Sequence, residues 1–131
     1  MEIRTHQGLD RRLCGRPLAV EEGAAAVGFE ATPEMAADER GLVHGGFVFG
    51  LADHAAMLAV NHPHVVLGSA EVRFLKPVAV GERLEARATV EETDGRKSRV
   101  KVEVLRAADV VMAGTFLCFV LERHVLEGAR R

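Results

Sequence analysis

The chain has 131 residues, enough for one domain with a buried core and too few for two. Its 17 Lys/Arg and 19 Asp/Glu give a net charge of −2, which argues against nucleic acid or an anionic membrane as a partner. The N-terminal sequence MEIRTHQGLDRR is charged and lacks the apolar stretch of a signal peptide. We therefore expect one domain over residues 1–131, located in the cytoplasm.

The first 41 residues predict short elements. Residues 1–16 are polar and mixed, and indicate a capping segment or a short helix with a turn at CGRP. Residues 17–31 hold two apolar runs separated by EEG, which predicts strand, turn and strand. Residues 32–41 predict one or two turns of helix, because Thr32 suits the N-cap, Pro33 the first helical position and Gly41 the end.

Residues 42–63, LVHGGFVFGLADHAAMLAVNHP, predict a long helix that is apolar on every side. It ends at Asn61 and Pro63, two residues that commonly terminate helices. The apolar run is too short for a membrane span and carries Asp53 and His54 at mid-length. We expect a buried helix enclosed on all sides, in which an unpartnered Asp53 would cost several kcal/mol.

Beyond this helix the apolar residues alternate with polar ones, which is typical of half-buried antiparallel strands. We predict strands at 70–74, 84–90, 100–104 and 110–121, joined in a meander by turns at KPVAVGE, TDGRK and RAAD. A flat sheet covers only one face of a helix, so a sheet must curl around this one. The sequence therefore predicts an α+β hotdog fold: an antiparallel curved sheet wrapped around one long central helix.

The two cysteines, Cys14 and Cys118, have neither the number nor the spacing of a disulfide framework or a zinc site. We interpret both as reduced, with Cys118 in the core. A metal site built from His44, Asp53, His54, His62 and His64 is the weaker alternative, because their spacing matches no known helical ligand motif. We expect neither a metal nor a cofactor.

The segment GLVHGGFVFGLADHAAMLAVN resembles the signature of the hotdog-fold acyl-CoA thioesterases of the phenylacetate-pathway and 4-hydroxybenzoyl-CoA type. That pattern is roughly G-x-x-H-G-G, with an acidic residue eight positions after the first Gly of the pair. The downstream AEVRFLKPVAVGERLEARATV is similar to the strand, Pro-containing turn and strand of the same family. The resemblance covers residues 41–121 and implies an acyl-CoA substrate, with CoA entering as part of the substrate.

Carried over residue by residue, the resemblance implies that the Gly45 N–H holds the thioester carbonyl oxygen. It also implies that Asp53 is the nucleophile or general base, and that His44 orients substrate or water. Relatives usually carry Asn or Gln where this chain has Asp38, and a second carboxylate there can repel the first or raise its pKa. Met57 stands where some relatives have a hydroxyl, so that contact is absent.

Thioester hydrolysis needs a donor for the developing oxyanion and a group that attacks carbon or activates water. The first turn of a helix leaves N–H groups unpaired at its positive end, and Gly45 and Gly46 let a carbonyl approach closely. Along one helix, however, Gly45 and Asp53 are about 12 Å apart, too far to meet at one carbonyl. We therefore expect a homodimer, and possibly a dimer of dimers, in which antiparallel helices bring each Gly45 near the other chain's Asp53.

A cationic turn follows Asp94-Gly95. Arg96, Lys97 and Arg99 are candidates to hold the CoA phosphates, with Ser98 assisting, although such clusters are more often simply solvated turns. Structural roles also remain open for Asp53, which can cap a loop or pair with His54, and for His44, which can serve as an N-cap or lie in the core.

Two other functions compete with hydrolysis of an acyl-CoA thioester. A non-catalytic hotdog protein that binds acyl-CoA or acyl carrier protein would keep Gly45 and the pocket, and Asp38 leaves room for it. A hydratase or dehydratase on the same fold is disfavoured, because neither an H-F-P-G-like nor a D-x-x-x-x-H pattern occurs. Acyl-group identity does not follow from the sequence.

Overall fold

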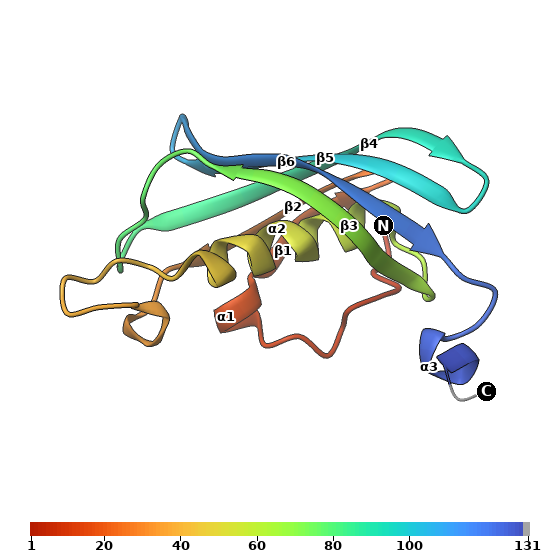
Figure 1. The fold of residues 1–131 in the computed structure, drawn as a ribbon, viewed down its shortest axis with the longest axis horizontal. Helices are drawn as coiled ribbons and strands as arrows, with labels where there is room; N and C mark the ends of the chain where they lie inside the picture. The colour runs from red at the N-terminus through yellow and green to blue at the C-terminus, as the bar shows by residue number, and fades with distance from the viewer. Residues whose placement is uncertain (130–131) are drawn as a thin grey trace.

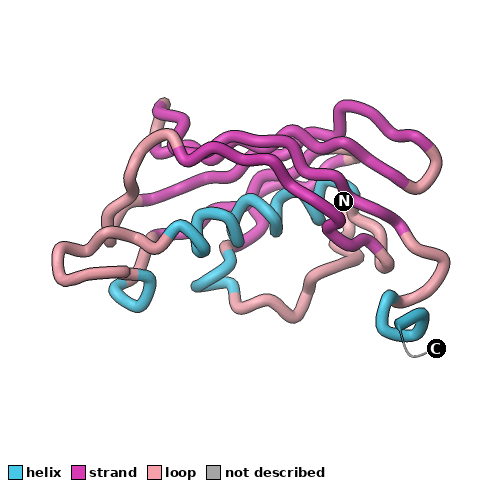
Figure 2. The backbone as a smooth tube through the Cα atoms, viewed as in Figure 1, coloured by secondary structure: helices cyan, strands magenta, loops and turns pink. Residues whose placement is uncertain are grey.

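The computed structural model describes residues 1–129 and has the predicted α+β hotdog architecture (Figure 1). Six strands form one antiparallel sheet: β1 (Arg16–Glu21), β2 (Ala24–Glu30), β3 (Val65–Phe74), β4 (Arg83–Asp94), β5 (Lys97–Arg106) and β6 (Asp109–Val120). The helical segments are α1 (Arg11–Cys14), the 3₁₀ turn η1 (Pro33–Met35), the central helix α2 (Gly45–Val60) and α3 (Val125–Ala129). The sheet curves over α2, which lies on one side of it (Figure 2).

The strand order is β1-β2-β4-β5-β6-β3, so the predicted four-strand meander is wrong in one respect. β4, β5 and β6 do form a meander, but β3 pairs with β6 and lies at the edge of the sheet opposite β1. Alternation shows which side chains face the core and carries no information on which strands pair. Placing β3 there lets the sheet reach around a second side of α2 (Figure 1).

The core forms between α2 and the inner face of the sheet. α2 packs against β2, β4 and β5, and the alternating valines of β5 are fully buried beneath it. The sheet does not enclose α2 completely, because one stripe of the helix is only partly covered: Gly46, Phe49, Gly50 and Asp53. We expected α2 to be enclosed on all sides, but within one chain the sheet covers only its inner face.

The residues at the helix ends explain where α2 and η1 begin and end. α2 ends at Asn61, which adopts the left-handed conformation (φ 51°) that Asn tolerates well. The helix expected over residues 32–41 is only η1, with Thr32 at its N-cap position but without a capping hydrogen bond from its side chain. Within residues 1–129, no helix combines the length and the apolar character needed to cross a membrane.

Candidate functional site

The N-terminal end of α2 presents backbone donors to a small cavity. His44 occupies the N-cap position in an extended conformation, and Gly45 is the first helical residue. No acceptor within residues 1–129 is recorded for the Gly45 N–H, as expected for the first turn of a helix. Gly45 lines a cavity of about 260 Å³ together with Phe74 and Val78. This end of α2 can therefore donate a hydrogen bond to a carbonyl oxygen.

His44 does not cap α2 with its side chain. Its backbone N–H donates to the Met35 carbonyl at 2.9 Å, which anchors the start of the helix to η1. The exposed ring lies beside Gly46, where an added Cβ would be 3.1 Å from the imidazole. His44 is therefore the N-cap residue by position but not through its side chain, and the ring makes no capping hydrogen bond that would compete with a bound molecule.

Asp53 lies on the partly covered stripe of α2, at the edge of a second cavity of about 500 Å³. Its Oδ1 atom is buried and has no hydrogen-bond partner within residues 1–129. Burial raises the pKa of this carboxyl from 3.8 to about 6, because the charged form is poorly solvated. The carboxylate is thus basic enough to accept a proton near neutral pH. Met57 lines the same cavity.

The N-terminal segment forms one wall of the Asp53 cavity, a role that sequence reasoning missed. Arg4 donates its backbone N–H to Asn61 Oδ1 at 2.8 Å, and Asn61 Nδ2 donates to the Glu2 carbonyl at 2.8 Å. These bonds hold Thr5 against the fold, with 7% of its surface exposed, and Thr5 and His6 both line the cavity. The polar residues 1–16 predicted only a capping segment or a short helix, and they carry no periodic signal from which this packing follows.

The two predicted catalytic groups do not share a cavity within one chain. Gly45 lies near the Phe74 end of β3, whereas Asp53 lies near Val65, Val66 and Leu67 at the other end of the same strand. Their helical spacing of about 12 Å agrees with this separation. A single chain therefore presents two half-sites.

His54 is structural in this fold. It is buried next to Asp53 in sequence, and its Nδ1 lies 3.0 Å from the Cys14 carbonyl, to which it donates. This bond ties α1 to α2. Burial lowers the pKa of His54, which keeps the ring neutral. The alternative that Asp53 is paired with His54 finds no support, because no hydrogen bond joins them within the described chain.

Asp38 lies in the exposed turn before α2, and the surface cavity that it lines shares Pro77 and Val78 with the Gly45 cavity. Its Oδ1 accepts hydrogen bonds from the backbone N–H groups of Arg40 at 3.0 Å and Leu42 at 3.2 Å. It also lines a shallow surface cavity near Arg106. The visible role of Asp38 is therefore to stabilise the turn that leads to His44.

The predicted cationic turn lies at the β4–β5 hairpin. Arg96 forms an ion pair with Glu122, and Arg99 pairs with Glu92 at 3.2 Å. Lys97 is exposed, whereas Ser98 points into the core. The structure therefore brings the three cations to one surface but leaves Ser98 out of the group.

The histidines and cysteines show no metal centre. Within residues 1–129, no three His, Cys, Asp or Glu side chains lie close enough together to hold a metal ion. His62 Nδ1 accepts the backbone N–H of His64, which explains the HPH sequence as a turn. Cys14 and Cys118 are free thiols, and burial raises the pKa of Cys118 to about 12.

Comparison with known proteins identifies relatives across most of the chain. The family model described as "Thioesterase superfamily" matches residues 40–113. Methylthioribose-1-phosphate isomerase of Aquifex aeolicus is 51% identical over 88% of this chain, which spans only 25% of that protein. Transcription factor FapR of Shouchella clausii is 30% identical over 78% of the chain, which corresponds to 53% of FapR. The chain thus spans from a quarter to about half of these two relatives.

Solved structures agree on the fold. An uncharacterized protein of Pyrococcus horikoshii superposes with a TM-score of 0.95 at 57% identity, covering 96% of this chain and 97% of that one. A variant of the phenylacetic acid degradation protein PaaI of Thermus thermophilus superposes with a TM-score of 0.77 at 33% identity, covering 83% and 95%. A hypothetical thioesterase of Streptococcus pneumoniae, solved with coenzyme A, shares the fold at 19% identity, with a TM-score of 0.75 over 83% and 87%.

Proposed function

Because the chain belongs to the thioesterase superfamily, we propose that it is an acyl-CoA thioesterase, which hydrolyses a thioester to a free acid and CoA. The observation that carries this proposal is the Asp53 carboxylate, whose Oδ1 is buried without a partner at the edge of a cavity. A buried, unpaired carboxylate costs free energy, and such groups concentrate where chemistry is done. Its pKa of about 6 leaves it mostly ionised at neutral pH.

Asp53 can act in either of two ways. As a general base it takes a proton from water, whose oxygen attacks the thioester carbon. As a nucleophile it attacks the carbon itself, and water then hydrolyses the resulting anhydride. In both cases the C–S bond breaks, CoA leaves as a thiolate, and the thiolate takes up a proton that comes from the water consumed in the reaction. A single turnover in isotopically labelled water identifies the nucleophilic route if the label appears in Asp53, which requires water to attack the Asp53 carbonyl of the anhydride; attack on the acyl carbon places the label in the product in both routes.

The Gly45 N–H is the proposed oxyanion donor. Negative charge develops on the carbonyl oxygen during the attack, and a donor fixed at the positive end of α2 stabilises that charge. Gly46 has no side chain to obstruct the approach, and the exposed His44 ring beside it would orient the substrate or the water. No metal or cofactor is needed for this chemistry.

The proposed active site is shared between two chains. Gly45 and Asp53 line separate cavities in one chain, and the stripe of α2 that carries Asp53 is only partly covered. β3 lies at an edge of the sheet, with one side unpaired within the described chain. An antiparallel two-fold dimer would cover the stripe and bring each Gly45 to the other chain's Asp53. Two such dimers can associate further into a tetramer.

The other predicted site residues would bind the substrate or support the site, without taking part in the chemical step. Met57 would contact the acyl group, since it lines the Asp53 cavity. Arg96, Lys97 and Arg99 would hold the CoA phosphates at the β4–β5 hairpin. Asp38 would act through the turn before α2 and not by direct contact, and Ser98 would support the hairpin from the core side.

A thiol-release assay across short, aromatic and long acyl-CoAs tests the proposed activity. Wild-type protein should release CoA from at least one class, and Asp53→Asn should not. Binding of a non-hydrolysable acyl-CoA should persist in Asp53→Asn, because the substitution keeps the volume of the side chain. If no acyl-CoA is hydrolysed while several are bound, the proposal of catalysis is wrong.

That last outcome would favour a second function, a binding protein for acyl-CoA or acyl carrier protein. The similarity to FapR supports this alternative, because FapR is named as a transcription factor and not as an enzyme. The matched region spans about half of FapR, so its role as a whole does not transfer to this chain. The assay above separates the two functions directly.

A further inference from the structure

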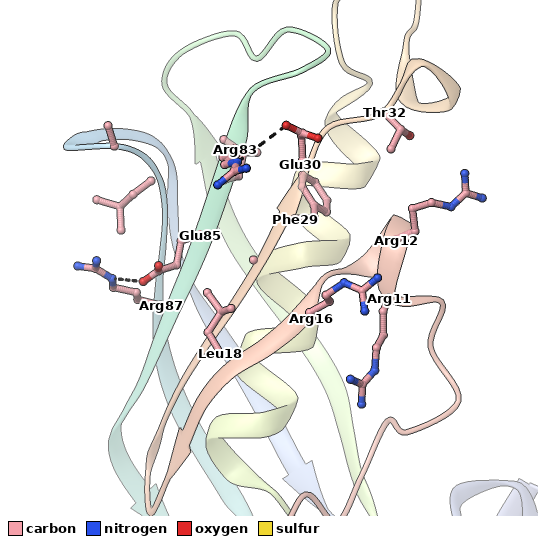
Figure 3. A pocket seen from close by; sticks show the side chains of 14 residues that line it. Arg11, Arg12, Arg16, Leu18, Phe29, Glu30, Thr32, Arg83, Glu85 and Arg87 are labelled. Carbon is pink, nitrogen blue, oxygen red and sulfur yellow. Dashed lines mark hydrogen bonds and ion pairs between the residues drawn. The ribbon is translucent and has the colours of Figure 1, made fainter.

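Another cavity lies on the β1 side of the molecule, at the opposite edge of the sheet from β3. It has a volume of about 870 Å³ and is open to solvent between α1, β1, β2 and β4 (Figure 3). Its lining is rich in arginine and includes only two glutamates; the arginines are Arg11, Arg12, Arg16, Arg83 and Arg87. A chain with a net charge of −2 therefore carries a local positive surface here. We call this cavity the arginine groove.

The arginines of the groove differ in how they are neutralised. Arg12 pairs with Glu34, Arg83 with Glu30 and Arg87 with Glu85. Within residues 1–129, Arg11 and Arg16 have no carboxylate within salt-bridge distance, and both line the groove. Two unneutralised guanidinium groups at one end of a cavity repel each other and attract a multivalent anion.

The same groove also offers apolar surface. Leu18 has 58% of its surface exposed, and its Cδ1 lies over Gly28. Figure 3 shows Leu18 and Phe29 between the arginines of α1 and β1 and those of β4. Arginine next to exposed apolar surface suits a ligand that has both a phosphate and a flat apolar ring.

A third feature is an unsatisfied hydroxyl. Thr32 lines the groove, and its Oγ1 is buried without a hydrogen-bond partner within the described residues. Leaving such a group unpaired is unfavourable, and a ligand atom that bonds it would offset that cost. This observation is independent of the arginine cluster, and because the atom is buried, a ligand would reach it only with a small shift of the groove lining.

We propose that the arginine groove binds a nucleotide, with Arg11 and Arg16 holding its phosphate groups and Leu18 supporting its base. The groove is distinct from the proposed catalytic site, because the Asp53 cavity is walled by β3 at the opposite edge of the sheet. Two sources share this chemistry. One is a free nucleotide that acts as a second ligand, and the other is the nucleotide end of CoA, in which case the cations of the β4–β5 hairpin would not hold the CoA phosphates.

Calorimetric titration of the full chain with ADP tests the proposal, with adenosine as the ligand that lacks phosphate. Wild type should bind ADP and bind adenosine at least tenfold more weakly. Arg11→Ala/Arg16→Ala should weaken ADP binding at least tenfold, whereas Arg11→Lys/Arg16→Lys should weaken it less. The matched control is Lys101→Ala/Arg123→Ala, which removes the same charge from exposed positions outside the groove and should leave ADP binding unchanged.

Thr32→Val provides a second variant, which removes the hydroxyl at nearly constant volume. It should weaken ADP binding several-fold while its melting temperature stays at or above that of wild type. The inference is overturned if ADP fails to bind wild type at millimolar concentration. Equal affinity for ADP in Arg11→Ala/Arg16→Ala and wild type would overturn it as well.

A second experiment decides between a free nucleotide and the nucleotide end of CoA. It compares KM for an acyl-CoA with KM for the corresponding acyl-pantetheine, which has no nucleotide. If the groove holds the end of CoA, Arg11→Ala/Arg16→Ala should raise KM for the acyl-CoA alone. If it holds a free nucleotide, KM should be unchanged for both substrates. The ADP titration does not require turnover, so failure of the thioesterase proposal would leave the test of the groove intact.

Discussion

The ring of Phe74 covers Gly45, the first residue of α2: a Cβ added to Gly45 would lie 3.4 Å from Cε1 of that ring. This distance is at the limit of ordinary van der Waals contact, and Phe74 is itself half exposed and able to shift. The position therefore accepts a small side chain. The proposed requirement for Gly45 in catalysis therefore concerns its N–H group.

Gly45→Pro should abolish turnover while the protein still folds. Proline suits the first helical position, and His44 before it already has the extended conformation (φ −63°, ψ 130°) that a following proline requires. The substitution removes the proposed oxyanion donor, so kcat should fall by a factor of about 10² or more. Gly45→Ala, which keeps the N–H, is the control and should retain most activity. Equal losses in both variants would indicate a steric effect.

Asp53→Asn should lower kcat by about two orders of magnitude or more, because the amide neither attacks carbon nor accepts a proton. In wild type, kcat/KM should rise with pH through an apparent pKa of about 6, as Asp53 becomes ionised. The residual activity of the variant should lack that inflection. A pH profile that keeps the inflection in Asp53→Asn would assign it to another group.

The same burial predicts an effect on stability. The folded pKa of Asp53 is raised to about 6 from 3.8, so the folded state holds this proton more tightly than the unfolded chain. The contribution of Asp53 to stability is therefore most favourable below about pH 4 and is lost as the pH rises through 6. At pH 8, Asp53→Asn should be more stable than wild type by on the order of 1–2 kcal/mol, a value discounted for partial exposure.

Urea denaturation at pH 4 and pH 8 measures this difference. The advantage of Asp53→Asn over wild type should be small at pH 4 and should appear at pH 8, since every other titrating group is common to both proteins. An advantage of the same size at both pH values would show that the buried charge is not its cause.

The elements could be predicted from the sequence because local patterns determine them. The apolar run that ends at Asn61 predicts α2, and the alternation of Val100, Val102 and Val104 with polar residues predicts β5. The position of β3 could not be predicted, because pairing with β6 depends on contacts between residues more than 40 positions apart, such as Val72 and Gly114. A periodic pattern within one strand does not encode its neighbour.

The residues of the candidate site also fall into two groups: those that a local sequence pattern identifies and those that only the folded chain brings together. His44, Gly45 and Asp53 follow one another in a recognisable spacing, so a short segment was enough to propose them. Thr5 reaches the Asp53 cavity only because the chain folds back over α2. The arginine groove is similarly assembled from α1, β1 and β4, and its charge is dispersed along the chain, where it looks like ordinary surface.

The cationic turn yields a separate prediction. Changing Arg96, Lys97 and Arg99 together to Ala should raise KM for an acyl-CoA several-fold, because the nucleotide phosphates would lose their counter-charges. The rate with a short thioester that lacks the nucleotide should change much less. Arg96 and Arg99 already pair with Glu122 and Glu92, so an equal response to both substrates would mean that this turn is only a solvated surface.

The shared active site is tested by mixing two inactive variants. If each site takes Gly45 from one chain and Asp53 from the other, homodimers of Gly45→Pro and of Asp53→Asn should both be inactive. A mixed dimer differs, because one of its sites collects both lesions and the other collects neither.

Unfolding and refolding the two variants together in equal amounts should make about half of the dimers mixed, each with one intact site of two. Activity should therefore return to roughly a quarter of wild type, provided that assembly is random. Native mass spectrometry establishes the fraction of mixed dimers independently of activity. Mixed dimers without recovered activity would mean that each chain completes its own active site. The antiparallel arrangement of the two helices would then be wrong, although Gly45 and Asp53 line separate cavities in one chain.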